Sequence, residues 1–179
     1  MEQWMELSRA LSFIRDIPDF PEPGILFKDI TPLLANGEAF QTVVSALLAE
    51  APSFTCITGI EARGFILGSA MALQSQVGFL PIRKAGKLPH TTISKSYGLE
   101  YGSDVIEAHI DAFSQTDSVL VVDDVLATGG TILAALEIIA ELGGQISEVV
   151  VLFEIAALQG RARIQAKFPD VSIRSLVCA

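Results

Sequence analysis

One stretch of this sequence decides the fold: Val-Leu-Val-Val-Asp-Asp-Val-Leu-Ala-Thr-Gly-Gly-Thr, residues Val119 to Thr131. Its first part is continuously apolar, which predicts a strand buried on both faces of a parallel sheet. Two carboxylates, Asp123 and Asp124, follow the strand, and then comes a turn rich in glycine and threonine. An apolar helical pattern continues to about Leu142, so the stretch predicts a strand, a turn and a helix.

The same order of strand, turn and helix occurs earlier in the chain. Residues 54–58 predict a short apolar strand that ends in the turn 59–64, and a helix is expected to follow through Gln74. Further strands are predicted at 77–82, 146–153 and 171–177. Apolar strands that alternate with helices predict one α/β doubly wound domain, with a mostly parallel sheet covered by helices on both faces. Ligands bind such sheets beyond the carboxyl ends of the strands, which points to the turns 59–64 and 123–131.

Two other regions depart from this pattern. Apolar residues at helical spacing predict an amphipathic helix over residues 1–16, which a proline-rich loop at 20–24 and a second helix at 37–50 follow. Residues 84–102 are mostly polar and turn-forming, and a loop of that length in a compact domain is usually functional. Alternation returns between residues 101 and 111, with Glu107 on the polar face, so we expect a half-exposed hairpin arm that carries a mobile lid.

Composition excludes several classes of protein. A chain of 179 residues, half of them hydrophobic, can bury one sizeable core. The net charge of −9, with 12 Lys and Arg, argues against nucleic acid as the main partner. No apolar run is long enough for a membrane span, and no secretory signal is recognisable at the start. Two cysteines, Cys56 and Cys178, make no disulfide framework, so we expect a cytoplasmic protein.

The turn at 127–131 has the composition of an anion site. Its glycines let backbone N–H groups approach a phosphate, and the N-terminus of the following helix adds a favourable dipole. Asp123 and Asp124 would repel a phosphate, so their natural partners are hydroxyl groups or a phosphate-bound Mg²⁺. A sugar phosphate offers both. The alternative is that the carboxylates cap the helix and the glycines only make the turn.

At residues 120–131 the sequence resembles the phosphoribosyl-pyrophosphate motif of the type I phosphoribosyltransferases. Four other segments, 20–30, 59–65, 82–89 and 99–102, resemble the adenine phosphoribosyltransferase family in their order and spacing. The resemblance runs from about Phe13 to Gly144, and the C-terminal tail carries little of it. The chain departs from the family at Glu61 and Ala62, where Asp and a small polar residue are frequent, and at Lys28, where Arg is frequent.

The resemblance implies an activity. A member of this family transfers the 5-phosphoribosyl group from 5-phosphoribosyl-1-pyrophosphate (PRPP) to N9 of adenine, which yields AMP and pyrophosphate in purine salvage. Mg²⁺ is the implied cofactor, held mainly by the substrate, and the implied assembly is a homodimer. An N-terminal hood, about residues 1–34, would cover the base, and a lid loop, about residues 84–102, would close over it.

The resemblance also implies roles for individual residues. Residues that would hold the 5-phosphate are Ala127, Thr128, Gly129, Gly130 and Thr131, and those for the ribose hydroxyls are Asp123 and Asp124. Residues that would face pyrophosphate are Glu61, Ala62, Arg63, Arg83, Lys84 and Lys87. Those that would meet adenine are Leu26, Phe27 and Lys28. The turn at Glu61 and Ala62 resembles one with a non-proline cis peptide.

Two residues are the implied catalytic groups. Arg63 would stabilise the leaving pyrophosphate, and Glu100 on the lid would exchange a proton at adenine N7. Tyr101 would pack the closed lid. By chain position alone, the lesser alternative is that Glu100 is a solvated loop carboxylate. Two other functions remain open: transfer to another nucleobase, and a non-catalytic regulator that senses PRPP. Glu100 on the lid and the basic cluster of Arg83, Lys84 and Lys87 disfavour the regulator.

Overall fold

The computed structural model describes residues 5–98 and 103–178. The chain forms two compact units, residues 1–50 and 51–179, and each is described by itself. The expectation of a single domain with an N-terminal hood and a lid loop stays a prediction. No helix among the described residues is long and apolar enough to cross a membrane.

The N-terminal unit combines short helices with a two-stranded sheet. Its elements are α1 (Leu7–Leu11), β1 (Arg15–Pro18), β2 (Leu26–Asp29), α2 (Thr31–Ala35) and α3 (Gly37–Leu48). The prediction of a helix to residue 16 is wrong, because α1 ends at Leu11 and the next residues pair antiparallel with β2. Opposite charges lie on paired residues of the two strands, with Arg15 opposite Asp29, and this pairing favours a ladder over a longer helix. The helix predicted at 37–50 is confirmed.

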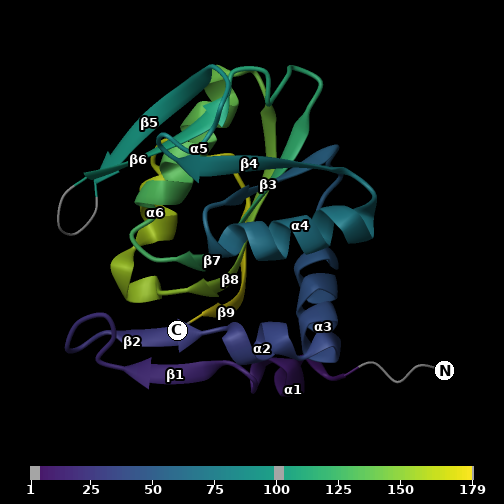
Figure 1. Ribbon diagram of the computed structural model, residues 1–179, viewed down its shortest axis with the longest axis vertical. Helices are drawn as coiled ribbons and strands as arrows, with labels where there is room; N and C mark the ends of the chain where they lie inside the picture. Colours follow the sequence, from purple (N-terminus) through teal and green to yellow (C-terminus); the bar gives the residue numbers. More distant parts are fainter. Residues whose placement is uncertain (1–4, 99–102, 179) are drawn as a thin grey trace. The chain divides into compact units, whose positions relative to one another are not determined.

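A seven-stranded sheet forms the centre of the C-terminal unit, in the order β5-β6-β4-β3-β7-β8-β9 (Figure 1). The five parallel strands are β3 (Cys56–Ile60), β4 (Gly78–Lys84), β7 (Ser118–Leu126), β8 (Gln145–Glu154) and β9 (Ile173–Cys178). The remaining two, β5 (Thr92–Gly98) and β6 (Ser103–His109), are antiparallel and extend the sheet beyond β4. The prediction of a mostly parallel α/β sheet is confirmed.

Helices cover both faces of this sheet. After β3 comes α4 (Arg63–Ser75), and α5 (Gly130–Glu141) follows β7. The buried cluster that contains the apolar face of α5 includes Val119 and Val121 of β7 but not Leu120 or Val122. Because successive side chains of a strand point to opposite faces, the alternate residues serve the other face, where α4 packs on β3 and β7. A short 3₁₀ turn, η1 (Ala156–Leu158), and α6 (Gly160–Gln165), neither of which the sequence pattern predicted, lie between β8 and β9.

The polar segment 84–102 is not one long loop. Residues 92–98 form β5, which pairs antiparallel with β6, so among the described residues of this segment irregular chain is confined to 85–91. Residues 92–97, Thr-Ile-Ser-Lys-Ser-Tyr, include β-branched and aromatic residues that favour a strand. The glycines elsewhere in residues 84–102 favoured the prediction of a loop. The expected hairpin arm is present, and its role as a lid stays a prediction.

Candidate active site

The phosphate turn lies between β7 and α5. Gly129 has φ +76°, a left-handed conformation that glycine adopts without steric cost, and it precedes the first residue of α5. The N-terminal amides of this 12-residue helix therefore begin at the end of a central strand. The turn has the backbone that an anion site requires, at the place where ligands bind doubly wound sheets.

Asp123 and Asp124 lie within β7 and not after it, because Val125 and Leu126 still pair with β8. Asp124 is only 4% exposed. Part of Asp123 is exposed, yet protein atoms surround its carboxylate. Burial and the neighbouring Asp124 carboxylate raise the pKa of Asp123 well above 3.8. Burial also raises the pKa of Asp124, and the Arg63 guanidinium opposes that rise.

The turn after β3 approaches the same strand. Arg63 Nη1 lies 2.8 Å from Asp124 Oδ2, which joins the predicted pyrophosphate residue to the predicted ribose residue. A Cβ on Gly64 would lie 2.8 Å from the Val122 carbonyl oxygen and 3.1 Å from Asp123 Oδ1, so the absence of a side chain permits this approach. The Glu61–Ala62 peptide is cis, as the resemblance implied.

Arg83 and Lys84 lie beside this turn, and each has a carboxylate partner. Arg83 Nη2 lies 3.2 Å from Glu61 Oε1, and Arg83 Nη1 donates to the Lys87 carbonyl oxygen at 3.1 Å. Burial favours the neutral form of Glu61, but hydrogen bonds from Arg83 and the Lys84 N–H outweigh it and lower the pKa of Glu61. Lys84 Nζ lies 2.9 Å from Asp104 Oδ2. The structure therefore brings Glu61, Arg83 and Lys84 together as predicted, and it gives Glu61 a defined partner.

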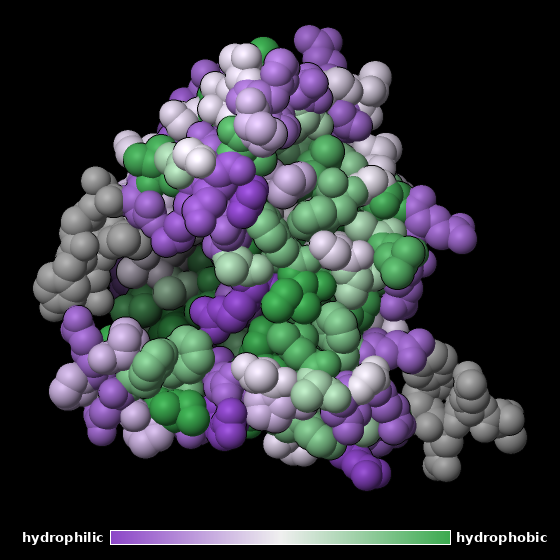
Figure 2. All heavy atoms as spheres, viewed as in Figure 1, coloured by the Kyte–Doolittle hydropathy of each residue, from purple (hydrophilic) through white to green (hydrophobic). Residues whose placement is uncertain are grey.

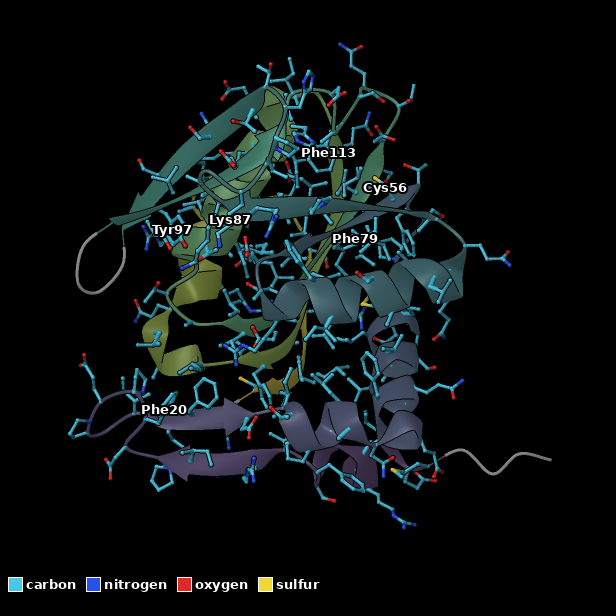
Figure 3. The ribbon with its side chains drawn as sticks, viewed as in Figure 1. Phe20, Cys56, Phe79, Lys87, Tyr97 and Phe113 are labelled. Carbon is cyan, nitrogen blue, oxygen red and sulfur yellow. The ribbon has the colours of Figure 1, made fainter. Side chains whose placement is uncertain are left out.

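The loop that carries Lys87 is fastened by a buried carboxylate that sequence reasoning missed. Glu107 of β6, 6% exposed, accepts hydrogen bonds from the backbone N–H groups of Lys87 and Leu88 and from the Thr92 hydroxyl. The Lys87 side chain itself is exposed, and Figure 3 labels it in the loop that follows β4. The alternating pattern had placed Glu107 on a polar, exposed face, so no sequence signal marked it as buried.

Tyr97 of β5 is a second residue that sequence reasoning missed (Figure 3). Its ring is buried, and its hydroxyl donates to Asp104 Oδ2 at 3.2 Å, the same carboxylate oxygen that Lys84 contacts. Burial raises the pKa of Tyr97, and the interaction of its hydroxyl with Thr131 opposes the rise. Tyr97 thus connects Thr131, in the first turn of α5, with Lys84 through the Asp104 carboxylate.

The predicted adenine residues belong to the N-terminal unit. Leu26, Phe27 and Lys28 lie in β2. Leu26 is 50% exposed, Phe27 packs edge-to-face against Phe20 at 5.1 Å, and Lys28 Nζ lies 2.7 Å from Asp16 Oδ1. An exposed strand of this kind has backbone and apolar groups available to a planar base. Glu100 and Tyr101 lie outside the described residues.

The donor set suits a magnesium ion held mostly by its substrate. Among residues 5–98 and 103–178 no group of three or more His, Cys, Asp or Glu side chains could hold a metal. Asp123 and Asp124 still offer carboxylate oxygens beside the phosphate turn. Mg²⁺ is typically bound by one or two carboxylates together with substrate phosphates and water, and these residues fit that arrangement.

A doubly wound sheet with a phosphate turn, paired aspartates and an arginine-bearing turn after the neighbouring strand defines a type I phosphoribosyltransferase. The model of the uracil phosphoribosyltransferase family matches residues 81–178. An adenine phosphoribosyltransferase of Streptomyces coelicolor is 50% identical over 93% of both chains, and one of Kosmotoga olearia is 48% identical over 92% of this chain and 96% of its own. The chain belongs to the adenine phosphoribosyltransferase family.

Solved structures agree with this assignment. The adenine phosphoribosyltransferase of Thermoanaerobacter pseudethanolicus matches with a TM-score of 0.90 and 43% identity, over 97% of this chain and 100% of the other. The Giardia lamblia enzyme, complexed with 9-deazaadenine, matches with a TM-score of 0.88 and 39% identity, over 98% of both chains. The uracil family model begins at residue 81 and omits the segment 26–28, whereas the relatives named for adenine cover almost the whole chain.

Proposed function

We propose that this chain transfers the 5-phosphoribosyl group of PRPP to N9 of adenine and releases AMP and pyrophosphate. The observation that carries the proposal is the contact of the two turns: Arg63, at the start of α4, pairs with Asp124, three residues before the phosphate turn begins at Ala127. One ligand that carries a 5-phosphate, ribose hydroxyls and a pyrophosphate can span such a site. The relatives named adenine phosphoribosyltransferase supply the identity of the base.

The binding roles follow from the chemistry of each position. The amides of residues 127–131 would hold the 5-phosphate, and Asp123 and Asp124 would accept hydrogen bonds from the ribose hydroxyls. When the sugar binds, Arg63 would exchange its Asp124 partner for pyrophosphate oxygens. Arg83, Lys84, Lys87 and the turn at Glu61 and Ala62 would bind the same leaving group.

Catalysis in this site would be mainly electrostatic. The bond between ribose C1 and the pyrophosphate oxygen breaks as adenine N9 forms its bond to C1, so positive charge develops on the sugar and negative charge on the leaving group. Arg63 would stabilise the leaving group, and Mg²⁺ bound to pyrophosphate oxygens would neutralise part of its charge. Glu100 would exchange the proton at adenine N7 while Tyr101 packs the closed lid.

Assembly and location are further parts of the proposal. The resemblance favours a homodimer, and α4 exposes the large apolar side chains of Ile66 (42%) and Leu73 (82%), which a second copy could cover. Figure 2 shows hydrophobic surface in the region of α4. The cytoplasmic location expected from cysteine usage stays a prediction.

A screen of nucleobases with PRPP and Mg²⁺ tests the function. Adenine is expected to be converted about 100-fold faster or more than hypoxanthine, guanine, orotate or uracil, because a site that hydrogen-bonds one base leaves its polar groups unpaired against another. Uracil is included because the matching family model bears its name. Conversion of another base at the adenine rate would reject adenine specificity. Binding of PRPP without turnover of any base would favour the regulator.

A further inference from the structure

The helix α6 lies against the back of the phosphate turn, and the contact is backbone against backbone. A Cβ built on Gly160, the first residue of α6, would lie 2.2 Å from the Ala127 carbonyl oxygen and 2.9 Å from the Gly129 amide nitrogen. A Cβ built on Gly129 would lie 2.6 Å from the Gly160 carbonyl oxygen. Neither of these two backbone segments can move aside as a flexible side chain would. The phosphate turn therefore occupies the space that a side chain at position 160 would need, and only glycine fits there.

The same helix brings a cation to the turn. Arg163, an exposed residue, places Nη1 3.4 Å from the Thr128 carbonyl oxygen. The same nitrogen lies 3.4 Å from the position that a Cβ on Gly130 would occupy, so it also lies close to the first residue of α5. The guanidinium thus adds positive charge beside the turn that would hold a phosphate.

A partly buried ion pair fixes α6 in this position. Arg161 donates to both carboxylate oxygens of Glu154, at the end of β8, and to the carbonyl oxygen of Ile173, the first residue of β9. The Ser175 hydroxyl donates to the same carboxylate at 3.0 Å. Glu154 is 6% exposed, and its hydrogen bonds with Arg161 lower its pKa, so the pair stays charged in the folded protein. The sheet edge therefore holds α6 on one side while the phosphate turn rests against the other.

We infer that Gly160 and Arg163 are positioning residues for the 5-phosphate of this enzyme's substrate and product. Gly160 limits how far the turn can move away from the ligand, and Arg163 strengthens the electrostatic attraction for the phosphate. Neither residue lies in the segments that resemble the family motifs, which end near Gly144. The inference rests on the proposed function, because it takes the turn at 127–131 to be the 5-phosphate site.

The test compares ligands that share the 5-phosphate with a ligand that lacks it. Titration calorimetry would measure the affinities of Gly160→Ala for AMP, ribose 5-phosphate and Mg²⁺-pyrophosphate, with Gly78→Ala as the matched control, because a Cβ on Gly78 meets nothing within 4 Å. For Gly160→Ala, we expect affinity for AMP and ribose 5-phosphate to fall about 10- to 100-fold, as overpacking against backbone implies. Affinity for Mg²⁺-pyrophosphate should change less than about twofold, and KM for PRPP should rise more than kcat falls.

The exposed arginine gives a second variant that leaves the backbone untouched. For Arg163→Gln we expect a three- to fivefold loss of affinity for AMP and ribose 5-phosphate, roughly the effect of one exposed charge, and this loss should shrink at high salt. Should Gly160→Ala fail to fold, Arg163→Gln alone decides the role of α6. Equal losses for pyrophosphate and for the 5-phosphate ligands, or no loss in either variant, would overturn the inference. Wild-type protein that binds ribose 5-phosphate but forms no AMP would reject the proposed function, and the ribose 5-phosphate affinities of the variants would still decide the inference.

Discussion

Replacement of Asp123 by asparagine is expected to stabilise the protein at neutral pH while it removes a carboxylate that we propose binds the ribose hydroxyls. The wild-type carboxylate is surrounded by protein atoms and adjoins the buried Asp124, and both conditions raise its pKa. Asparagine keeps an Oδ1 atom that can accept the hydrogen bond now donated by the Asp124 N–H at 2.9 Å. The substitution therefore removes a charge and keeps a contact.

The size of the effect follows from the charges around the site. Two like unit charges about 5 Å apart repel by about 3 kcal/mol at the effective dielectric constant of a partly buried site. Because Arg63 offsets part of this repulsion at Asp124, we expect Asp123→Asn to raise the free energy of unfolding by roughly 1–2 kcal/mol. For a chain of this length, that gain corresponds to roughly 2–8 °C in Tm.

The pH dependence shows whether the ionised Asp123 carboxylate stabilises or destabilises the fold. A carboxyl group whose folded-state pKa is raised stabilises the fold below its unfolded-state pKa, and this contribution is lost as pH rises through the folded-state pKa. The advantage of Asp123→Asn should therefore be largest near pH 8 and shrink as pH falls toward 4. Thermal and urea unfolding at several pH values measure it, with Asp170→Asn as the control because Asp170 is exposed. A variant less stable than wild type at pH 8, or a gain independent of pH, would refute the reasoning.

Two further predictions concern the other side of the site. Glu100→Gln is expected to slow single-turnover AMP formation by about 10²–10⁴ while AMP affinity changes little, and near-normal turnover would show that Glu100 does not carry the proton. Gly59→Ala is expected to destabilise the protein by about 1–3 kcal/mol, because a Cβ there would lie 2.4 Å from the Gly64 carbonyl oxygen. Urea unfolding against the Gly78→Ala control measures this loss, and equal stability of the two variants would contradict it.

Most of the central sheet could be predicted from sequence because its signal is local and strong. The apolar run from Val119 to Val122 can only be buried on both faces, and the position of the phosphate turn follows from it. Strand ends were harder to place. β7 continues through Asp123 and Asp124 because its neighbour β8 is long enough to pair with Leu126, and a pairing partner is not visible in the strand's own residues.

The errors share a physical cause, which is that tertiary contacts decided the local structure. Arg15–Pro18 form a strand because β2 lies opposite, and Thr92–Gly98 form one because β6 does. The same holds in the site. Glu107, on an expected exposed face, is buried, and Gly160 supports a turn more than thirty residues earlier in the chain. The spacing of residues along the sequence does not indicate either contact.

The ion pairs of Arg63, Arg83 and Lys84 also bear on how the proposed site would discriminate among anions. Arg63, Arg83 and Lys84 have Asp124, Glu61 and Asp104 as partners, so an incoming anion must compete with carboxylates already in place. Free inorganic phosphate, abundant in cells, is small and can replace few of these contacts at once. A ligand that also fills the phosphate turn gains enough from its other end to displace them. In a protein of net charge −9, this competition would keep the site from being blocked by the commonest competitors of its substrate.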